Sequence, residues 1–271
     1  MMTMTLSISV LGPLVIESND CRLGNVPKKA RALLAFLAAQ RGQAVGRERL
    51  TDLLWPHQKS ERAYHSLRNC LFELRQALGP SAPRFMVTDH RSCRIRDVVI
   101  DLDRFERLSR SPHRSELQAA ADLYRGEFLA GSDIDSEPFQ EWLAAERGLT
   151  LALVCDLLQR LIAALGAAGE HGAAIQSGCR LVALDPLSEI GQRALIHAFA
   201  LAGRPSEALR QYKSCAETLE RELGVAPDAE TQTLAETILR SNRAEKERNY
   251  HLISRINDFP PQAVGSTPNR A

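Results

Sequence analysis

The sequence predicts a mainly α-helical protein in two parts, and three observations carry that prediction. At the start of the chain, short β-branched runs are followed by three helical patterns and then by two strands around a polar turn. Beyond Asp101 the patterns are helical alone, and each is bounded by Gly, Pro or Ser/Asp signals. Within that second part, residues match one another at an offset of 34 positions. Two different architectures therefore follow each other along the chain.

The first elements are short strands. Leu6–Val10 and Leu14–Ile16 are β-branched runs separated by Gly12-Pro13, and Cys21–Leu23 follows a Ser-Asn-Asp turn signal. Because such runs are typical of strands and Gly-Pro is typical of turns, we expect a small antiparallel sheet here.

Three helices and a hairpin follow. Apolar residues at helical spacing, each series stopped by Gly or Pro, predict helices over Lys28–Gln40, Arg47–Trp55 and Ser60–Leu78. Phe85–Thr88 and Cys93–Arg96 then flank a polar turn, which predicts a β-hairpin. A helix-turn-helix pair followed by such a hairpin is a winged helix, which we place at residues 1–97.

The second part reads as an all-α repeat domain. We expect helices over Arg104–Leu108, Ser115–Tyr124, Pro138–Gly166, His171–Ala183, Ser188–Ala202 and Ser206–Leu223. The offset of 34 aligns Leu161 with Leu195, Ile162 with Ile196, Ala164 with Ala198, Ala168 with Ala202, Gly169 with Gly203, and Ala174 with Ala208. This period, with small residues at helix crossings, is the tetratricopeptide pattern. It predicts a tetratricopeptide-like domain over residues 98–240, followed by a charged and then disordered tail over residues 241–271.

Charge divides the chain in the same way. Residues 1–97 contain 15 Lys and Arg against 8 Asp and Glu, a balance of +7. Residues 98–271 contain 19 against 25, a balance of −6. The basic part is therefore expected to meet a polyanion, and the acidic part a different partner.

An enzyme is disfavoured because the phosphate-binding loop, nucleophile-elbow and zinc-protease motifs are absent. Asp133, Asp135 and Glu137 lack the central Gly and final Glu of a calcium-binding loop. We expect no catalytic residue, no metal and no cofactor. The 6 cysteines form no C-x-x-C pair, so they are expected as reduced thiols in the core of a cytoplasmic protein. No apolar run reaches the roughly 18 residues of a membrane helix.

The third helix carries the residues of greatest interest. Leu67, Leu71, Leu74 and Leu78 fall within about 60° of one another and form a narrow apolar stripe. On the far side lie Arg62, His65, Asn69, Phe72, Glu73 and Gln76, with Arg68 and Arg75 on one flank. Arg can bridge a guanine, and Asn or Gln can pair with an adenine, so this face suits a DNA groove. A solvated surface helix is the alternative.

Two residues on that face raise questions. An exposed Phe72 costs solvation unless something covers it, either a thymine methyl group or a domain interface. A carboxylate at Glu73 repels phosphate, although it can accept from a cytosine amino group. The sequence leaves both questions open.

Further contacts to DNA are expected from other basic residues. Lys28 and Lys29 begin the first helix and Arg91 and Arg94 lie on the hairpin, each with a solvated surface as its alternative. Lys59 lies in the loop before the third helix, where the alternative to the DNA backbone is another protein. The predicted DNA-binding set is Lys28, Lys29, Lys59, Arg62, His65, Arg68, Asn69, Phe72, Arg75, Gln76, Arg91 and Arg94.

Several segments resemble a known family. KKARALLAFLAAQRGQAVGRERLTDLLWP followed by SLRNCLFELRQALG resembles the winged-helix domain of the antibiotic-regulatory transcription factors of bacteria, the SARP type. DLDRFERL, LYRGEFLAG, EPFQEWLAAER and ALRQYKSCAETLERELGVAPDAET resemble the bacterial transcriptional activator domain that follows it. The resemblance covers about Ser7 to Leu239, which is nearly the whole chain.

The resemblance implies an activator that binds direct repeats in double-stranded DNA near a promoter, as a side-by-side homodimer, and recruits RNA polymerase. Ser60–Leu78 would then be the recognition helix, Asp89–Cys93 the wing tip and Trp55–Ser60 the loop that faces polymerase. Members of the family often carry basic residues where this chain has Glu73 and Gln76, and a Gly-aromatic pair in place of its Ser92-Cys93.

Two hypotheses therefore stand. The first is a cytoplasmic, sequence-specific DNA-binding activator without a membrane partner, and the basic balance of residues 1–97 favours it. The alternative is a helical-repeat adaptor whose winged helix binds protein rather than DNA, which Glu73 and the atypical wing favour.

Overall fold

The computed structural model describes residues 5–18, 21–22 and 26–257, and the chain divides into two compact units, Met1–Leu161 and Ile162–Ala271. The last dozen residues, predicted to be disordered, lie outside the described residues. The boundary between the units falls inside one long helix, α7 (Glu137–Ala167).

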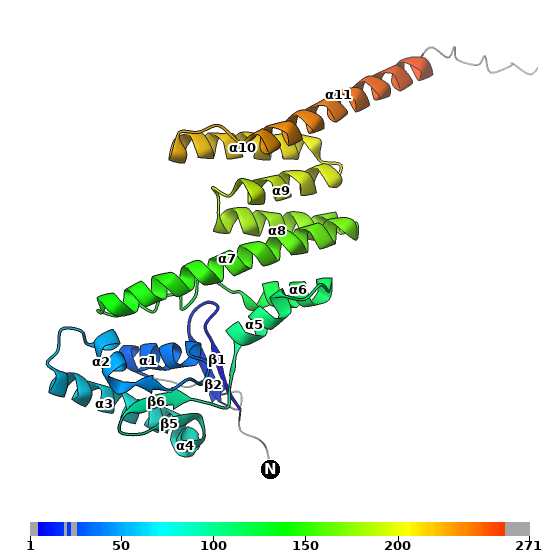
Figure 1. Ribbon diagram of the computed structural model, residues 1–271. Helices are drawn as coiled ribbons and strands as arrows, with labels where there is room; N and C mark the ends of the chain where they lie inside the picture. The colour runs from blue at the N-terminus through cyan, green and yellow to red at the C-terminus, as the bar shows by residue number, and fades with distance from the viewer. Residues whose placement is uncertain (1–4, 19–20, 23–25, 258–271) are drawn as a thin grey trace, which may run out of the picture. The chain divides into compact units, whose positions relative to one another are not determined.

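The first unit has a mixed strand and helix order (Figure 1). Its strands are β1 (Leu6–Ser9), β2 (Val15–Ser18), β3 (Cys21–Arg22), β4 (Val45–Gly46), β5 (Met86–Thr88), β6 (Ser92–Ile95) and β7 (Val98–Ile100). Its helices before α7 are α1 (Lys28–Ala39), α2 (Arg47–Leu54), α3 (Ser60–Leu78), the short 3₁₀ turn η1 (Gly79–Ser81), α4 (Ala82–Phe85), α5 (Asp101–Ser109) and α6 (Arg114–Leu123). The second unit contains α8 (His171–Leu184), α9 (Glu189–Leu201), α10 (Pro205–Leu223) and α11 (Ala229–Asn257). The predicted fold class, a winged helix followed by a helical repeat, is confirmed.

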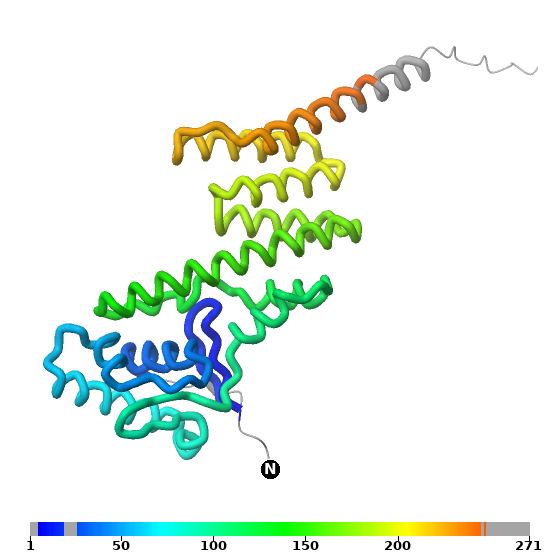
Figure 2. Tube along the Cα trace, in the orientation of Figure 1, coloured from blue at the N-terminus to red at the C-terminus, as the bar shows by residue number. Residues whose placement is uncertain are grey.

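Two small sheets frame the winged helix. The hairpin β5–β6 pairs with β4 in the order β4-β6-β5. The other sheet has the order β3-β2-β1-β7, in which β1 is antiparallel to β2 and parallel to β7. The chain can be followed in Figure 2 from the hairpin back toward β1 and then into α5. Strand β7 was not predicted, because three residues show no periodicity and their partner strand lies far away in sequence.

The LYRGEFLAG segment, residues 123–131, follows the winged helix and is hydrogen-bonded to the sheet that contains β1 and β2. The backbone amides of Arg125, Leu129 and Ala130 donate to carbonyls of the β1–β2 turn, Val10–Gly12, at 2.9, 2.9 and 3.0 Å. Gly12 has a φ of 140°, which other residues rarely adopt, and a Cβ atom there would lie 3.3 Å from the Cβ of Arg125, so both the backbone and the close approach favour glycine. This segment therefore belongs to the same compact unit as the winged helix.

The buried Asp101 and the half-buried Trp142 stabilise the same unit. The buried carboxylate of Asp101 accepts from the amides of Val10 and Leu11 at 2.8 and 3.2 Å, and burial raises its pKa. The ring of Trp142 packs edge-on against Phe36, with ring centroids 4.9 Å apart. Trp142 also packs edge-on against Phe128 and tilted against Phe139.

The second unit repeats its backbone geometry at the predicted offset. Gly169 and Gly203 both have positive φ angles, 74° and 69°, where α7 and α9 end. The amide of Glu170 donates to Leu165, and the amide of Arg204 donates to Phe199, 34 positions later. These are the hydrogen bonds of a Schellman-type helix end, so α7 and α9 end in the same type of C-terminal cap.

Helix α11 is a correction to the predicted tail. It runs from Ala229 to Asn257 and includes the charged residues 242–248, for which no helix was predicted. The charged residues 242–248 obscure the apolar period, whereas Leu234 and Ile238 pack against Ile196 of α9. This packing against α9 stabilises the first part of the helix.

Five of the cysteines have described side chains, and none of these five forms a disulfide bond. Cys70, Cys93 and Cys215 are buried as predicted, and burial raises the pKa of the Cys70 and Cys215 thiols to about 11. Cys155 is half-buried and Cys179 is exposed, so the core prediction is wrong for Cys179.

One helix among the described residues, α7, is long and apolar enough to cross a membrane by length and composition. A core helix of a soluble protein passes the same test, and 39% of the most apolar part of α7 is buried inside the protein.

Candidate nucleic-acid interface

Helix α3 occupies the residues predicted for the recognition helix, Ser60–Leu78. Its leucines at positions 67, 71 and 74 are 0–1% exposed, so they fix the helix to the domain. On the opposite side Arg62, His65, Asn69, Phe72 and Gln76 are exposed, and Arg68 and Arg75 are exposed on one flank. Seven of the predicted set of twelve therefore lie on α3, and all seven are exposed.

Glu73 lies at the flank of that face. It is half-buried, and its charge raises the pKa of the neighbouring Cys70 thiol, which burial raises more strongly. The charge of Lys29 acts on the same thiol in the opposite direction. A half-buried carboxylate at the flank repels phosphate less than one at the centre of the open face.

The side chain of Arg75 is hydrogen-bonded to the wing. Its guanidinium donates to the hydroxyl of Thr88, the last residue of β5. The bond joins the last turn of α3 to the hairpin, so Arg75 positions the wing relative to the helix. Sequence spacing cannot reveal this contact, because Thr88 looks like an ordinary strand end.

The wing turn is held by Asp89. Its carboxylate accepts from the amides of Arg91 and Ser92 at 2.7 and 2.6 Å, and these hydrogen bonds lower its pKa. The carbonyl of Arg91 accepts from the amide of Arg47 at 2.9 Å, which ties the turn to the start of α2. Arg91 and Arg94 are both exposed, as a backbone-contacting wing requires.

The lysines near the start of α1 differ from each other. Lys28 is exposed, as is Lys59 before α3. Lys29 is half-buried: its amine donates to the carbonyl of Leu54 at 2.8 Å and lies 5.3 Å from the centre of the Trp55 ring. Lys29 thus stabilises the end of α2.

Two basic residues outside the predicted set lie beside the hairpin. The side chain of Arg96, which follows β6, donates to the carbonyl of Arg84 in α4 at 3.2 Å. Both residues are exposed. Their shared position could not be inferred from sequence, because α4 itself was not predicted.

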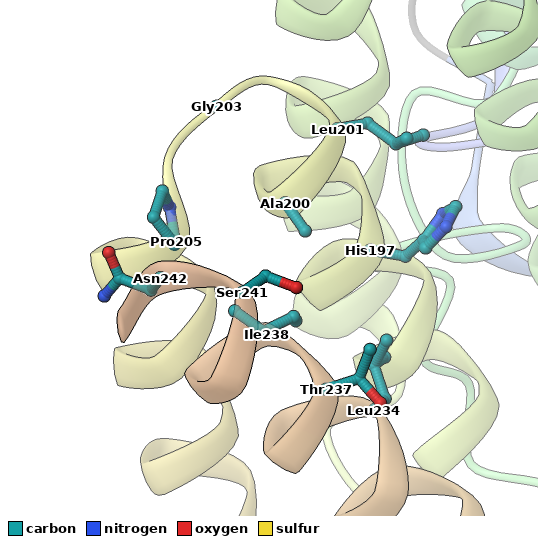
Figure 3. Close-up of a pocket in the computed structure, with 10 residues that line it drawn as sticks. All are labelled: His197, Ala200, Leu201, Gly203, Pro205, Leu234, Thr237, Ile238, Ser241 and Asn242. Atoms are coloured by element: carbon teal, nitrogen blue, oxygen red, sulfur yellow. The ribbon is translucent and has the colours of Figure 1, made fainter. Parts of the chain in front are cut away.

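The second unit has a groove of its own, about 380 Å³ in volume, between α9 and α11 (Figure 3). Apolar atoms of Ala200, Leu201, Leu234 and Ile238 line it, and His197, Thr237, Ser241 and Asn242 stand at its sides. A mostly apolar groove with a few polar groups is typical of binding sites for apolar segments or small molecules.

A polar network fixes the helix that forms one wall of this groove. The carboxylate of Asp228 accepts from the amide of Thr231 at 2.7 Å, which caps the start of α11. Arg193 of α9 contacts the same carboxylate at 2.5 Å and Glu230 at 3.1 Å. The backbone bond to Thr231 contributes most to the lowering of the Asp228 pKa, to about 2.

Comparison with known proteins identifies the two parts. A family model described as bacterial transcriptional activator domain matches residues 100–239, and one described as transcriptional regulatory protein, C terminal, matches residues 23–92. Regulatory protein DnrI of Streptomyces peucetius is 30% identical over 88% of this chain and 93% of its own length. The chain belongs to the SARP family of bacterial transcriptional regulators. It is a transcriptional activator with a DNA-binding winged helix.

Other SARP-type relatives differ in length. Transcriptional regulatory protein MoaR1 of Mycobacterium tuberculosis is 28% identical over 86% of this chain and 78% of its own length. Regulatory protein AfsR of Streptomyces coelicolor is 29% identical over 89% of this chain, which spans 25% of AfsR.

A solved structure has the same fold. Mycobacterium tuberculosis EmbR, in complex with a low affinity phosphopeptide, superposes with a TM-score of 0.72 and 24% sequence identity, covering 94% of this chain and 72% of that chain. The SARP family consists of regulators and is not typically enzymatic.

Proposed function

We propose that this SARP protein activates transcription in the cytoplasm by binding direct repeats in promoter DNA as a side-by-side dimer and recruiting RNA polymerase. The exposed polar face of α3, in a segment with a balance of +7, supports DNA as the partner of the first unit. Residues 1–97 act as the DNA-binding part, and residues 98–240 make protein contacts.

The roles within the DNA-binding part follow from the contacts of each residue. Arg68, Asn69 and Gln76 read bases, since their side chains suit guanine and adenine edges and are exposed. The exposed basic residues Lys28, Lys59, Arg62, Arg91 and Arg94, with His65, contact the backbone. Arg75 and Lys29 support these contacts through Thr88 and Leu54, where their side chains are bonded.

RNA polymerase is expected at the α2–α3 loop, Trp55–Ser60. The loop has a defined shape, because Trp55 is buried and the hydroxyl of Ser66 donates to the Gln58 side chain at 3.1 Å. His57 and Lys59 are exposed on it.

The test is binding of the purified protein to DNA from its own upstream region across a salt series. Affinity that falls as salt rises, with one sequence preferred over competitor DNA, supports the proposal. Arg68→Ala and Asn69→Ala each weaken specific binding by about 1–3 kcal/mol.

The matched control is Arg107→Ala, which removes one exposed charge from α5 rather than from α3. It leaves sequence preference unchanged. If no sequence is preferred at any salt concentration, the proposal fails and the alternative of a protein-binding adaptor takes its place.

A further inference from the structure

Phe72 is the largest apolar feature of the open face of α3. Its side chain is 58% exposed, and it is the one aromatic residue among the exposed large apolar side chains of the described residues. Single exposed apolar side chains are common on protein surfaces, so it is the position of Phe72 among exposed Arg, Asn and Gln side chains that points to a partner. The helix is fixed behind it by buried leucines, so the ring has no route into the core.

The neighbours of Phe72 identify the kind of partner. One helical turn away lie Arg68 and Asn69 on one side and Gln76 on the other, all exposed. Their side chains present donors and amide groups, and the residues before β7 have an excess of positive charge. A polyanion with base edges complements this surface better than an apolar protein patch does.

Only one natural base offers an apolar group in the major groove. Thymine carries a 5-methyl group there, and a phenyl ring can contact it. We infer that Phe72 contacts the 5-methyl group of a thymine and thereby selects thymine at one position of each half-site. This inference rests on the proposed function, because it assumes that α3 enters the major groove.

The experiment removes the methyl group without changing base pairing. Once footprinting has located the bound site, each thymine in it is replaced singly by deoxyuridine. The wild-type protein loses about fourfold in affinity at one thymine per half-site, the size expected for one buried methyl group. Phe72→Ala binds the thymine and deoxyuridine duplexes equally at that position. Because Phe72 is exposed, this variant keeps its fold, which thermal unfolding checks.

Two control variants separate the contact from general binding. Phe72→Leu keeps an apolar group and so retains part of the preference for thymine. Arg68→Ala weakens binding to both duplexes equally and leaves their ratio unchanged.

The failures are distinguishable. Sequence-selective binding in which no deoxyuridine substitution matters, or in which Phe72→Ala keeps the wild-type preference, overturns the thymine contact alone. A Phe72→Ala protein with normal DNA affinity but altered self-association assigns Phe72 to a protein interface and overturns it too. Absence of any selective binding removes the proposed function and the thymine contact together.

Discussion

The two units of this protein are stabilised over very different sequence distances. In the first unit, Asp101 bonds to Val10 and Leu11, 91 and 90 positions away, and Ser136 donates to Leu53, 83 positions away. In the second, Arg193 reaches Asp228 and Thr231, 35 and 38 positions away, about one repeat further along. The first unit therefore depends on distant parts of the chain, whereas the second is assembled from neighbouring repeats.

The unfolding of the two units can be followed by different spectroscopic signals. Both tryptophans, Trp55 and Trp142, lie in the first unit, so tryptophan fluorescence follows the unfolding of that unit alone. Circular dichroism follows the helices of both. Variants that act on one unit should change one signal more than the other.

The largest expected effect is that of Trp142→Ala. The change removes the packing of the Trp142 ring against Phe36, Phe128 and Phe139 and should lower the free energy of unfolding of the first unit by about 3–5 kcal/mol. Denaturant titration followed by Trp55 fluorescence measures it. Trp142→Phe, the control, keeps an aromatic ring and costs less. An equal loss in the second unit would contradict the independence of the two units.

Asp101→Ala should cost about 2–4 kcal/mol, because it leaves the buried amides of Val10 and Leu11 without an acceptor. Asp101→Asn retains one acceptor oxygen and should cost less. Since burial raises the pKa of Asp101, its folded form keeps the proton to higher pH than the unfolded chain does. Its contribution to stability therefore falls as pH rises through the folded pKa, and this slope should disappear in Asp101→Asn.

Gly178→Ala tests the packing between repeats in the second unit. An added Cβ atom would lie 2.9 Å from Cδ1 and 3.2 Å from Cα of Leu195, so α8 and α9 must separate. We expect a loss of about 1–3 kcal/mol, seen by circular dichroism with unchanged fluorescence. Gly172→Ala, on the same helix with no atom within 4 Å, should be neutral or slightly stabilising. Equal changes in the free energy of unfolding for Gly178→Ala and Gly172→Ala would contradict close packing at Gly178.

The smallest expected effect is at Asp228. Asp228→Ala removes the cap of α11 and should cost about 1 kcal/mol, whereas Asp228→Asn keeps a capping oxygen and should cost less. The pKa of Asp228 is lowered to about 2 from the ordinary 3.8. Its contribution is therefore present above the ordinary value and is lost as pH falls from about 4 toward 2, the opposite direction to Asp101. Unchanged acid unfolding in Asp228→Asn would argue against the network with Arg193.

Much of the candidate interface could be predicted, because helical periodicity is local. The bounds of α3 and its buried stripe through Leu67, Leu71 and Leu74 follow from spacing alone. The same spacing placed Asn69 and Phe72 on the open face and Arg68 on its flank, and the structure has all three exposed. Their roles at DNA stay predictions.

The bonding of individual side chains could not be predicted. Lys29 and Arg75 have the residue types of DNA contacts, yet their partners are Leu54 and Thr88, 25 and 13 positions away. Glu73 was expected within the open face and lies half-buried at its flank. Which partner a long cationic side chain takes depends on the crossing of helices and strands, and single-sequence patterns carry no record of it.

The sequence by itself determined the three helices and hairpin of the winged helix, the open face of α3 and the 34-residue repeat, because each depends on residues within a turn or within one repeat. Only the tertiary structure decided that β7 pairs with β1, that LYRGEFLAG binds the Val10–Gly12 turn, and that the first compact unit runs on to Leu161. Those pairings join segments about ninety or more residues apart, where the outcome depends on the packing of everything between them.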